Sequence, residues 1–203
     1  MGTRHLTCVV ERREMKVAQY GQWDGYLSGQ GQTIVDFISK LTKSGLQKLR
    51  QHVRECTWIN PKEVERRLKS AGARDGWMTL DQSKKWTKQY PELSRDTGAG
   101  ILALILKDGP KQLQDEREFA ESLFCEWAYV VDLDNEVLEV YEGFQKTKHA
   151  KGRFASMSRG KDPDGSTSEY FPVKLVKKLP FRNIAKAFET FRAKFEAAKE
   201  AKE

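Results

Sequence analysis

Residues 3–33 read TRHLTCVVERREMKVAQYGQWDGYLSGQGQT, and this stretch sets the fold expected for the chain. Runs 3–10 and 15–20 have the composition of strands, and the polar connection between them has the length of a hairpin turn. A glycine-rich segment follows. It leads to apolar residues at helical spacing from Ile34 to Leu41, with Thr33 as the expected helix cap. The stretch therefore predicts a β-hairpin, a glycine-rich loop that could line a ligand site, and a helix.

The rest of the chain repeats this mixture of strand pairs and helices. A second hairpin is predicted over 127–133 and 136–141, and a further strand over 171–176. Helices are expected over 46–53, from Asn60-Pro61 onward, and over 81–89, 93–108, 112–124 and 181–199. Segregated strand pairs predict an α+β fold, in which a mainly antiparallel sheet of two hairpins plus one further strand packs with several helices.

Two glycines inside the predicted 93–108 helix need an explanation. Gly98 and Gly100 each cost helix propensity of about 1 kcal/mol. Close approach of another element to the backbone is the simplest reason to keep them there. Segment 94–100 is thus a second small-residue helix start, and we expect that it and the first glycine loop could face one pocket.

Composition indicates one domain spanning residues 1–203. The chain has a net charge of +7, with 38% hydrophobic and 32% charged residues. Residues 144–169 are expected to form a basic mobile loop, and residues 196–203 a charged C-terminal tail that frays. No apolar run approaches the ~20 residues of a membrane span. No secretory leader is evident either, so a soluble cytoplasmic protein is expected.

The three cysteines do not form a recognisable metal or redox motif. They stand at positions 8, 56 and 125, and no CxxC pair occurs. His52 and His149 also lack metal-ligand spacing with any cysteine or acid. We therefore expect buried reduced thiols, no metal and no cofactor.

The glycine loop is the strongest candidate for a ligand site. It contains Tyr20, Trp23 and Tyr26 among glycines and glutamines, but it has neither a Walker motif nor GxGxxG. Aromatic rings can stack on a base, and amides at a helix start can hold an anion. The hypothesis is a solvent-reachable hollow ringed by these aromatics and backed by unpaired amides, holding a nucleotide-like or other anionic small molecule. The candidate ligand-binding residues are Arg4, Tyr20, Gln22, Trp23, Asp24, Tyr26, Gln30, Arg95 and Asp96. The alternative is a loop whose rings fold back into the core.

Several of these motifs resemble an uncharacterised protein family found in phages and microbes. The resemblance rests on residues 3–6 (TRHL), 18–26 (AQYGQWDGY), 28–31 (SGQG), 93–98 and 123–130 (LFCEWAYV). It covers most of residues 3–180 and departs from the family pattern at Leu27, where proline is expected. The family has no assigned activity, so the resemblance implies only a phage-type accessory protein.

Two other functions remain open. The first is an amide hydrolase of the amino-terminal-nucleophile type. Its candidate catalytic residues are His5, Asp24 and Cys125, with Thr3 as the nucleophile if the chain is trimmed to that residue. The second is nucleic-acid binding through the basic loop, in which cations alternate with aromatic residues. The residues of that surface would be Lys146, Lys148, Lys151, Arg153, Arg159 and Lys161.

Overall fold

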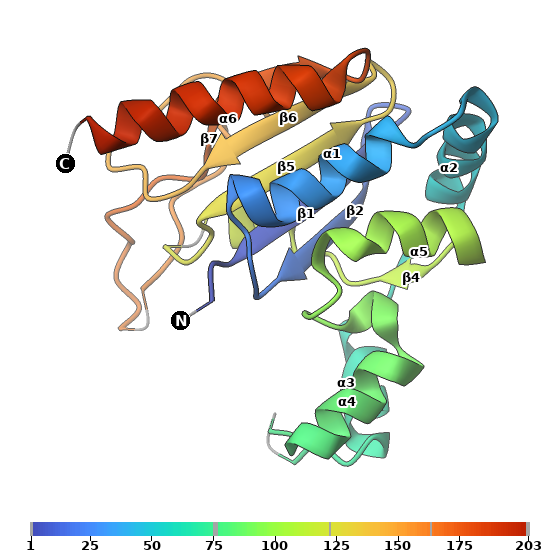
Figure 1. Cartoon of the computed structure of the whole chain (residues 1–203). Helices are drawn as coiled ribbons and strands as arrows, with labels where there is room; N and C mark the ends of the chain where they lie inside the picture. Colours follow the sequence, from blue (N-terminus) through green and yellow to red (C-terminus); the bar gives the residue numbers. More distant parts are fainter. Residues whose placement is uncertain (1, 75–76, 122, 163, 202–203) are drawn as a thin grey trace.

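A five-stranded sheet in the order β2-β1-β5-β6-β7 forms the centre of the protein (Figure 1). The computed structural model describes residues 2–74, 77–121, 123–162 and 164–201. The strands are β1 (His5–Glu11), β2 (Glu14–Gly21), β5 (Trp127–Asp132), β6 (Val137–Glu142) and β7 (Lys174–Pro180). All neighbouring strands are antiparallel except β1 and β5, which run parallel. The α+β class with a mainly antiparallel sheet is confirmed.

Strand β1 lies inside the sheet and is buried at every position. Its residues alternate between the two faces, because side chains along a strand point to opposite sides. Val9 belongs to the core under the helices. Leu6, Cys8 and Val10 belong to a second core on the other face, where Phe154 and Val173 of the β6–β7 connection pack on them. Burial on both sides explains why neither face of the 3–10 pattern is purely polar.

Four helices accompany one face of the sheet. They are α1 (Gln32–Ser39), α2 (Lys43–Glu55), α5 (Ile101–Asp108) and α6 (Ile184–Glu200). Their apolar residues, such as Ile34, Leu102 and Phe188, meet Tyr129 and Val131 of the sheet in one buried cluster. Figure 1 shows α6 and α1 crossing this face, with α2 and α5 at its side.

A small helical insert extends from the main body, at the bottom of Figure 1. It contains α3 (Pro61–Ser70) and α4 (Leu80–Gln89), and it is joined to the body through the short pair β3 (Thr57–Trp58) and β4 (Gln112–Leu113). Its own apolar cluster is built on Ile59, Val64, Trp86 and Leu93. The expected start at Asn60 is confirmed, since its side chain accepts a hydrogen bond from the Lys62 amide at 2.9 Å.

Several predicted elements are wrong or displaced. Residues 112–124 do not form one helix, because they contain β4 and a short 3₁₀ turn at Arg117–Glu121. Thr33 does not cap α1, since a π-helical turn at Leu27–Gly31 runs directly into that helix. The last strand lies at Lys174–Pro180 rather than 171–176. The final helix runs over Ile184–Glu200 rather than 181–199, and residues 202–203 of the expected tail lie outside the described residues.

Part of the predicted basic loop is anchored to the sheet. Phe154 is buried, and the Arg153 guanidinium bonds to the carboxylates of Asp132 and Glu139, both of which are 1% accessible. Burial alone would raise the pKa of the Glu139 carboxyl, but bonds from Lys178, Tyr141 and Arg153 outweigh it and lower that pKa. The Arg153 guanidinium therefore compensates two buried charges, although the residue itself is exposed.

Replacing Arg153 should destabilise the fold. Arg153→Met leaves two buried carboxylates without their shared cation, and we expect a loss of about 2–3 kcal/mol of unfolding free energy in denaturant titration. Lys151→Met, at an exposed position two residues away, should change that free energy by less than about 0.5 kcal/mol. Equal effects of the two substitutions would show that Arg153 is not an anchor.

Candidate functional site

The glycine loop and segment 94–100 meet above His5, at the amino end of β1. The backbone comes so close to the imidazole that a Cβ added at Gly21 would lie 1.9 Å from His5 Cε1. On the other side, Gly98 has φ +46°, and a Cβ there would lie 2.9 Å from His5 Nε2. The expected close approach is thus confirmed for Gly98. A Cβ at Gly100 would meet nothing nearer than 3.8 Å, so that glycine has no such reason.

His5 is sealed from solvent in this position. Its side chain is fully buried, and neither ring nitrogen has a hydrogen-bond partner. Burial lowers the pKa of His5 to about 4, with the charge of Asp24 opposing the shift. A neutral and inaccessible imidazole gives the general-base hypothesis no support.

The two segments are bonded directly to each other. The Gln22 amide donates to the Arg95 carbonyl at 3.1 Å, and Trp23 Nε1 donates to Asp96 Oδ1 at 3.0 Å. The Ala99 amide donates to Gln30 Oε1 at 3.0 Å. Segments that are far apart in the sequence therefore close over His5.

The expectation of unpaired amides in the loop is wrong for five of them, those of Gln22, Gly25, Gly29, Gln30 and Gly31. The Gly25 amide bonds to the Thr3 carbonyl at 2.9 Å, and the Gln30 amide bonds to the Asp24 carbonyl at 2.7 Å. The amides of Gly29 and Gly31 both donate to the Tyr26 carbonyl. The Gly29 and Gly31 amides close the π-helical turn, and the Gly25 and Gln30 amides bond to other backbone carbonyls, so these four donors cannot hold an anion.

The loop aromatics nevertheless face solvent. Trp23 is 48% and Tyr26 is 42% accessible, so the alternative in which these rings fill the core does not describe them. The Tyr26 hydroxyl donates to Asp24 Oδ1 at 3.0 Å. Tyr20 is different, because its ring packs edge-on against Phe119 at 4.6 Å between centroids.

A cleft of about 550 Å³ lies beside the loop, between the sheet and the helical insert. Three predicted residues, Tyr20, Arg95 and Asp96, line it. Trp23 and Tyr26 do not line the cleft. Trp23 is linked to it through the hydrogen bond from its indole to the carboxylate of Asp96, a lining residue. The other walls of the cleft come from the insert and from β4 and its continuation: Val64, Leu68, Trp77, Met78, Thr79, Leu80, Ser83, Trp86, Leu93, Ser94, Gln114 and Glu116.

Glu116 supplies an unusual acid to this cleft. One of its oxygens, Oε2, accepts the Tyr20 amide at 2.7 Å, so the carboxyl group covers the edge of β2. Burial raises the pKa of Glu116 to about 7, although the Tyr20 amide opposes the shift. The cleft therefore contains a carboxyl group that is partly protonated near neutral pH.

The remaining predicted residues lie outside the cleft walls. The Arg4 guanidinium stands 4.4 Å above the centre of the Phe124 ring. Cys125 is fully buried, its thiol donates to the Trp127 carbonyl, and burial raises its pKa well above the ordinary value. Such a thiol is a poor nucleophile, because the reactive form is the thiolate.

The predicted nucleic-acid surface is distributed over several contacts. Arg153 is committed to Asp132 and Glu139, Lys146 lies over the Tyr170 ring and Arg159 over the Phe171 ring. Lys148 and Arg159 line a small hollow of about 150 Å³, while Lys151 and Lys161 are exposed.

Sequence reasoning missed the insert side of the cleft. Trp77 is 82% and Leu80 is 81% accessible, and both lie on the cleft wall. Treating 112–124 as a helix hid Glu116, which belongs to an extended segment along β2. Single exposed side chains such as Trp77 leave no periodic signal, so only the structure could reveal them.

Comparison with models of known protein families, with curated proteins and with solved structures finds no match to this chain. Among the described residues, no group of three or more His, Cys, Asp or Glu side chains could hold a metal ion. Within that same part of the chain, every helix is too short or too polar to cross a bilayer.

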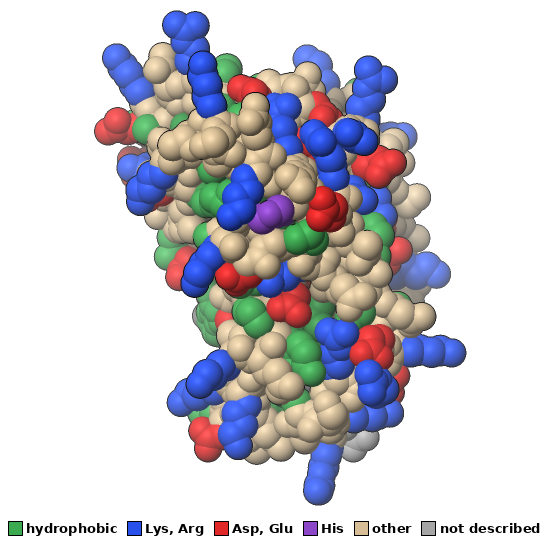
Figure 2. Space-filling view, turned by 90° about the vertical axis from the view of Figure 1, so that its right-hand side faces the viewer, with side chains coloured by type: hydrophobic (Ala, Val, Ile, Leu, Met, Phe, Trp, Pro, Cys, Tyr) green, Lys and Arg blue, Asp and Glu red, His purple; other side chains and the backbone are tan. Residues whose placement is uncertain are grey.

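On the face formed by α2, α5 and the insert, positive and negative side chains are interspersed around small hydrophobic patches (Figure 2).

The contact between His5 and Gly21 can be tested by adding the missing methyl group. Gly21→Ala should lower the unfolding free energy by about 3 kcal/mol, because the imidazole is confined between Gly21 and Gly98 and cannot retreat. The double variant His5→Ala/Gly21→Ala should be more stable than the sum of the single effects predicts, with a coupling of at least about 1 kcal/mol. Strict additivity in denaturant titrations would refute this packing.

The position of Glu116 predicts a pH dependence of stability. Because the pKa is raised from 4.5 to about 7 in the fold, the folded state binds more protons between these values, and its stability falls as pH rises through them. Glu116→Gln should remove this loss. It should stabilise the protein by on the order of 1–2 kcal/mol near pH 8 and by little near pH 4.5.

Thermal melts across this range are the measurement, and Glu118→Gln is the matched control at an exposed position. A Glu116→Gln advantage that is the same at every pH would mean that the carboxyl group does not titrate in this window.

Proposed function

We propose that this chain is a non-enzymatic, phage-type accessory protein that binds a nucleotide-like anionic small molecule in the cleft beside the glycine loop. One observation carries the proposal: the cleft combines aromatic and aliphatic walls with one cation, Arg95, and two acids, Asp96 and Glu116, in about 550 Å³. That volume suits a small-molecule ligand, for which mostly apolar walls and a few polar groups are typical. The phage-type role rests on the sequence resemblance alone.

The cleft offers a different group for each part of a nucleotide. Trp77 stands on its wall with most of its ring exposed, and can stack on a base. Arg95 supplies a guanidinium, which matches the geometry of a phosphate group. Glu116 supplies carboxyl oxygens that can accept a hydrogen bond from a base amino group.

This proposal moves the binding site from the loop to its neighbour. The loop amides are bonded within the protein, so the anion contact is assigned to Arg95 instead. Trp23 does not contact the ligand in this proposal. Its indole donates a hydrogen bond to Asp96 at 3.0 Å and so fixes the position of that residue in the cleft wall.

The two alternatives gain no comparable observation. A hydrolase would need a reactive group at the surface, whereas His5 and Cys125 are both buried. For a nucleic-acid surface on the basic loop, the Arg153 guanidinium is not free to contact phosphate, because it is paired with Asp132 and Glu139. Both stay predictions of the sequence.

A panel of nucleoside triphosphates, monophosphates and nucleosides tests the proposal through tryptophan fluorescence and calorimetry. At least one nucleotide should bind, and Arg95→Ala should weaken that nucleotide about tenfold or more but leave its parent nucleoside little changed. Trp77→Ala should weaken both, since it removes the stacking surface.

Arg182→Ala is the control, because Arg182 is an exposed arginine that does not line the cleft. The proposal fails if no member of the panel binds, or if Arg95→Ala and Arg182→Ala have the same effect.

A further inference from the structure

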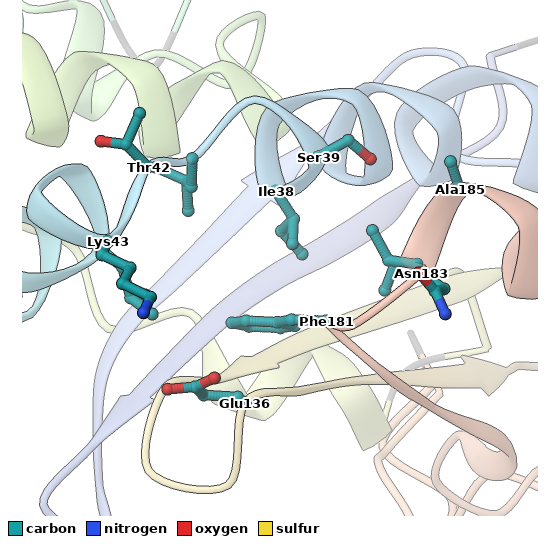
Figure 3. A pocket seen from close by; sticks show the side chains of 11 residues that line it. Ile38, Ser39, Thr42, Lys43, Glu136, Phe181, Asn183 and Ala185 are labelled. Atoms are coloured by element: carbon teal, nitrogen blue, oxygen red, sulfur yellow. The ribbon is translucent and has the colours of Figure 1, made fainter.

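A second pocket lies toward the opposite end of the strands from the cleft. The cleft includes Tyr20, which pairs with Leu6 near the start of β1. The second pocket includes Glu136, in the turn beyond β5, where the Leu133 amide bonds to Val10 near the end of β1. It has a volume of about 400 Å³, is open to solvent, and is lined by the end of α1, the start of α2, the β5–β6 turn and the start of α6 (Figure 3).

The inner wall of this pocket is apolar and continuous with the main core. Ile38 and Ile184 are buried members of that core, and Leu41, Leu46 and Phe181 are partly buried against it. Figure 3 shows the Phe181 ring between the side chains of Ile38 and Glu136. An apolar group placed here would extend an existing hydrophobic surface, and removing that surface from water is favourable.

The two charged residues on the rim of the pocket, Glu136 and Lys43, differ in how far their charges are compensated. Glu136 is bonded by the Arg50 guanidinium at 2.9 Å, so its negative charge is already compensated. Lys43 brings a positive charge to the same rim as the first residue of α2, a thirteen-residue helix whose N-terminal dipole has the same sign. The remaining field at the mouth of the pocket therefore favours an anion.

We propose that this pocket binds an amphipathic monocarboxylate. The carboxylate lies at Lys43, and the hydrocarbon body lies on Phe181, Ile38 and Leu46. One anionic head on an apolar body matches both Lys43 and the apolar wall of the pocket. This site is independent of the proposed function of the cleft.

Decanoate, used below its micellar concentration, is the probe, and decylamine is the matched ligand with the opposite charge. Calorimetry should show decanoate binding more tightly than decylamine by about tenfold. Lys43→Glu should abolish that preference. Lys40→Glu is the control, because it changes the net charge by the same amount at an exposed residue that does not line the pocket. The preference for decanoate should persist in that variant.

Ser39→Trp provides a test that does not depend on charge. Ser39 is exposed on the rim, so a large ring there should fill the mouth of the pocket and prevent decanoate binding while the melting temperature stays close to that of the parent chain. Arg95→Ala, in the cleft, should leave decanoate binding unchanged. Equal binding of decanoate and decylamine, or full binding by the Lys43→Glu variant, would overturn the proposal.

Discussion

The parallel pairing of β1 with β5 is the constraint on which the rest of the structure depends. Each strand belongs to its own antiparallel hairpin, and the register His5↔Trp127 to Val10↔Asp132 joins the two hairpins into one sheet. Parallel neighbours need a long crossover. Here the crossover begins with β2, crosses the helix face of the sheet, and makes an excursion into the insert. The crossing brings the loop after β2 and segment 94–100 together over His5, and the excursion forms the cleft.

Local sequence patterns predicted much of this architecture. Both hairpins, the Asn60 cap and the second half of the expected 93–108 helix follow from alternation, capping chemistry and helical spacing, which depend on neighbouring residues. Only Ile101–Asp108 of that range is α-helical, and Ala103 within it is exposed. The parallel join could not be predicted in the same way, because pairing between residues more than a hundred positions apart leaves no local pattern. Residues 112–124 show the same limit. Their apolar spacing suits a helix, but the edge of β2 needs partners, and Glu116 bonds to both Ala18 and Tyr20 from an extended backbone.

The candidate site was predicted in part for a similar reason. The glycines and the meeting of two small-residue segments could be inferred from composition and order along the chain, whereas the sequence left open whether the aromatic rings face solvent or the core. The bonding state of the loop amides could not, because it depends on the π-helical turn at Leu27–Gly31. Gly29 and Gly31 looked like anion donors in sequence, yet their amides close that turn. The cleft is formed by a surface of the insert that has no motif, so sequence alone pointed to the loop beside it.

Buried polar groups at both ends of β1 are only partly satisfied. At the carboxyl end, Asp132 and Glu139 are held by Arg153, and Glu11 by Arg54 at 2.7 Å. Glu11 Oε2 and Arg50 Nε nevertheless lack a hydrogen-bond partner at that end, as do both ring nitrogens of His5, Arg4 Nε and Gln22 Oε1 at the amino end. Each such atom costs free energy that an apolar side chain would avoid. Stability alone does not favour keeping them there. Such groups occur at both ends of the strand, which are also the ends at which the cleft and the second pocket lie.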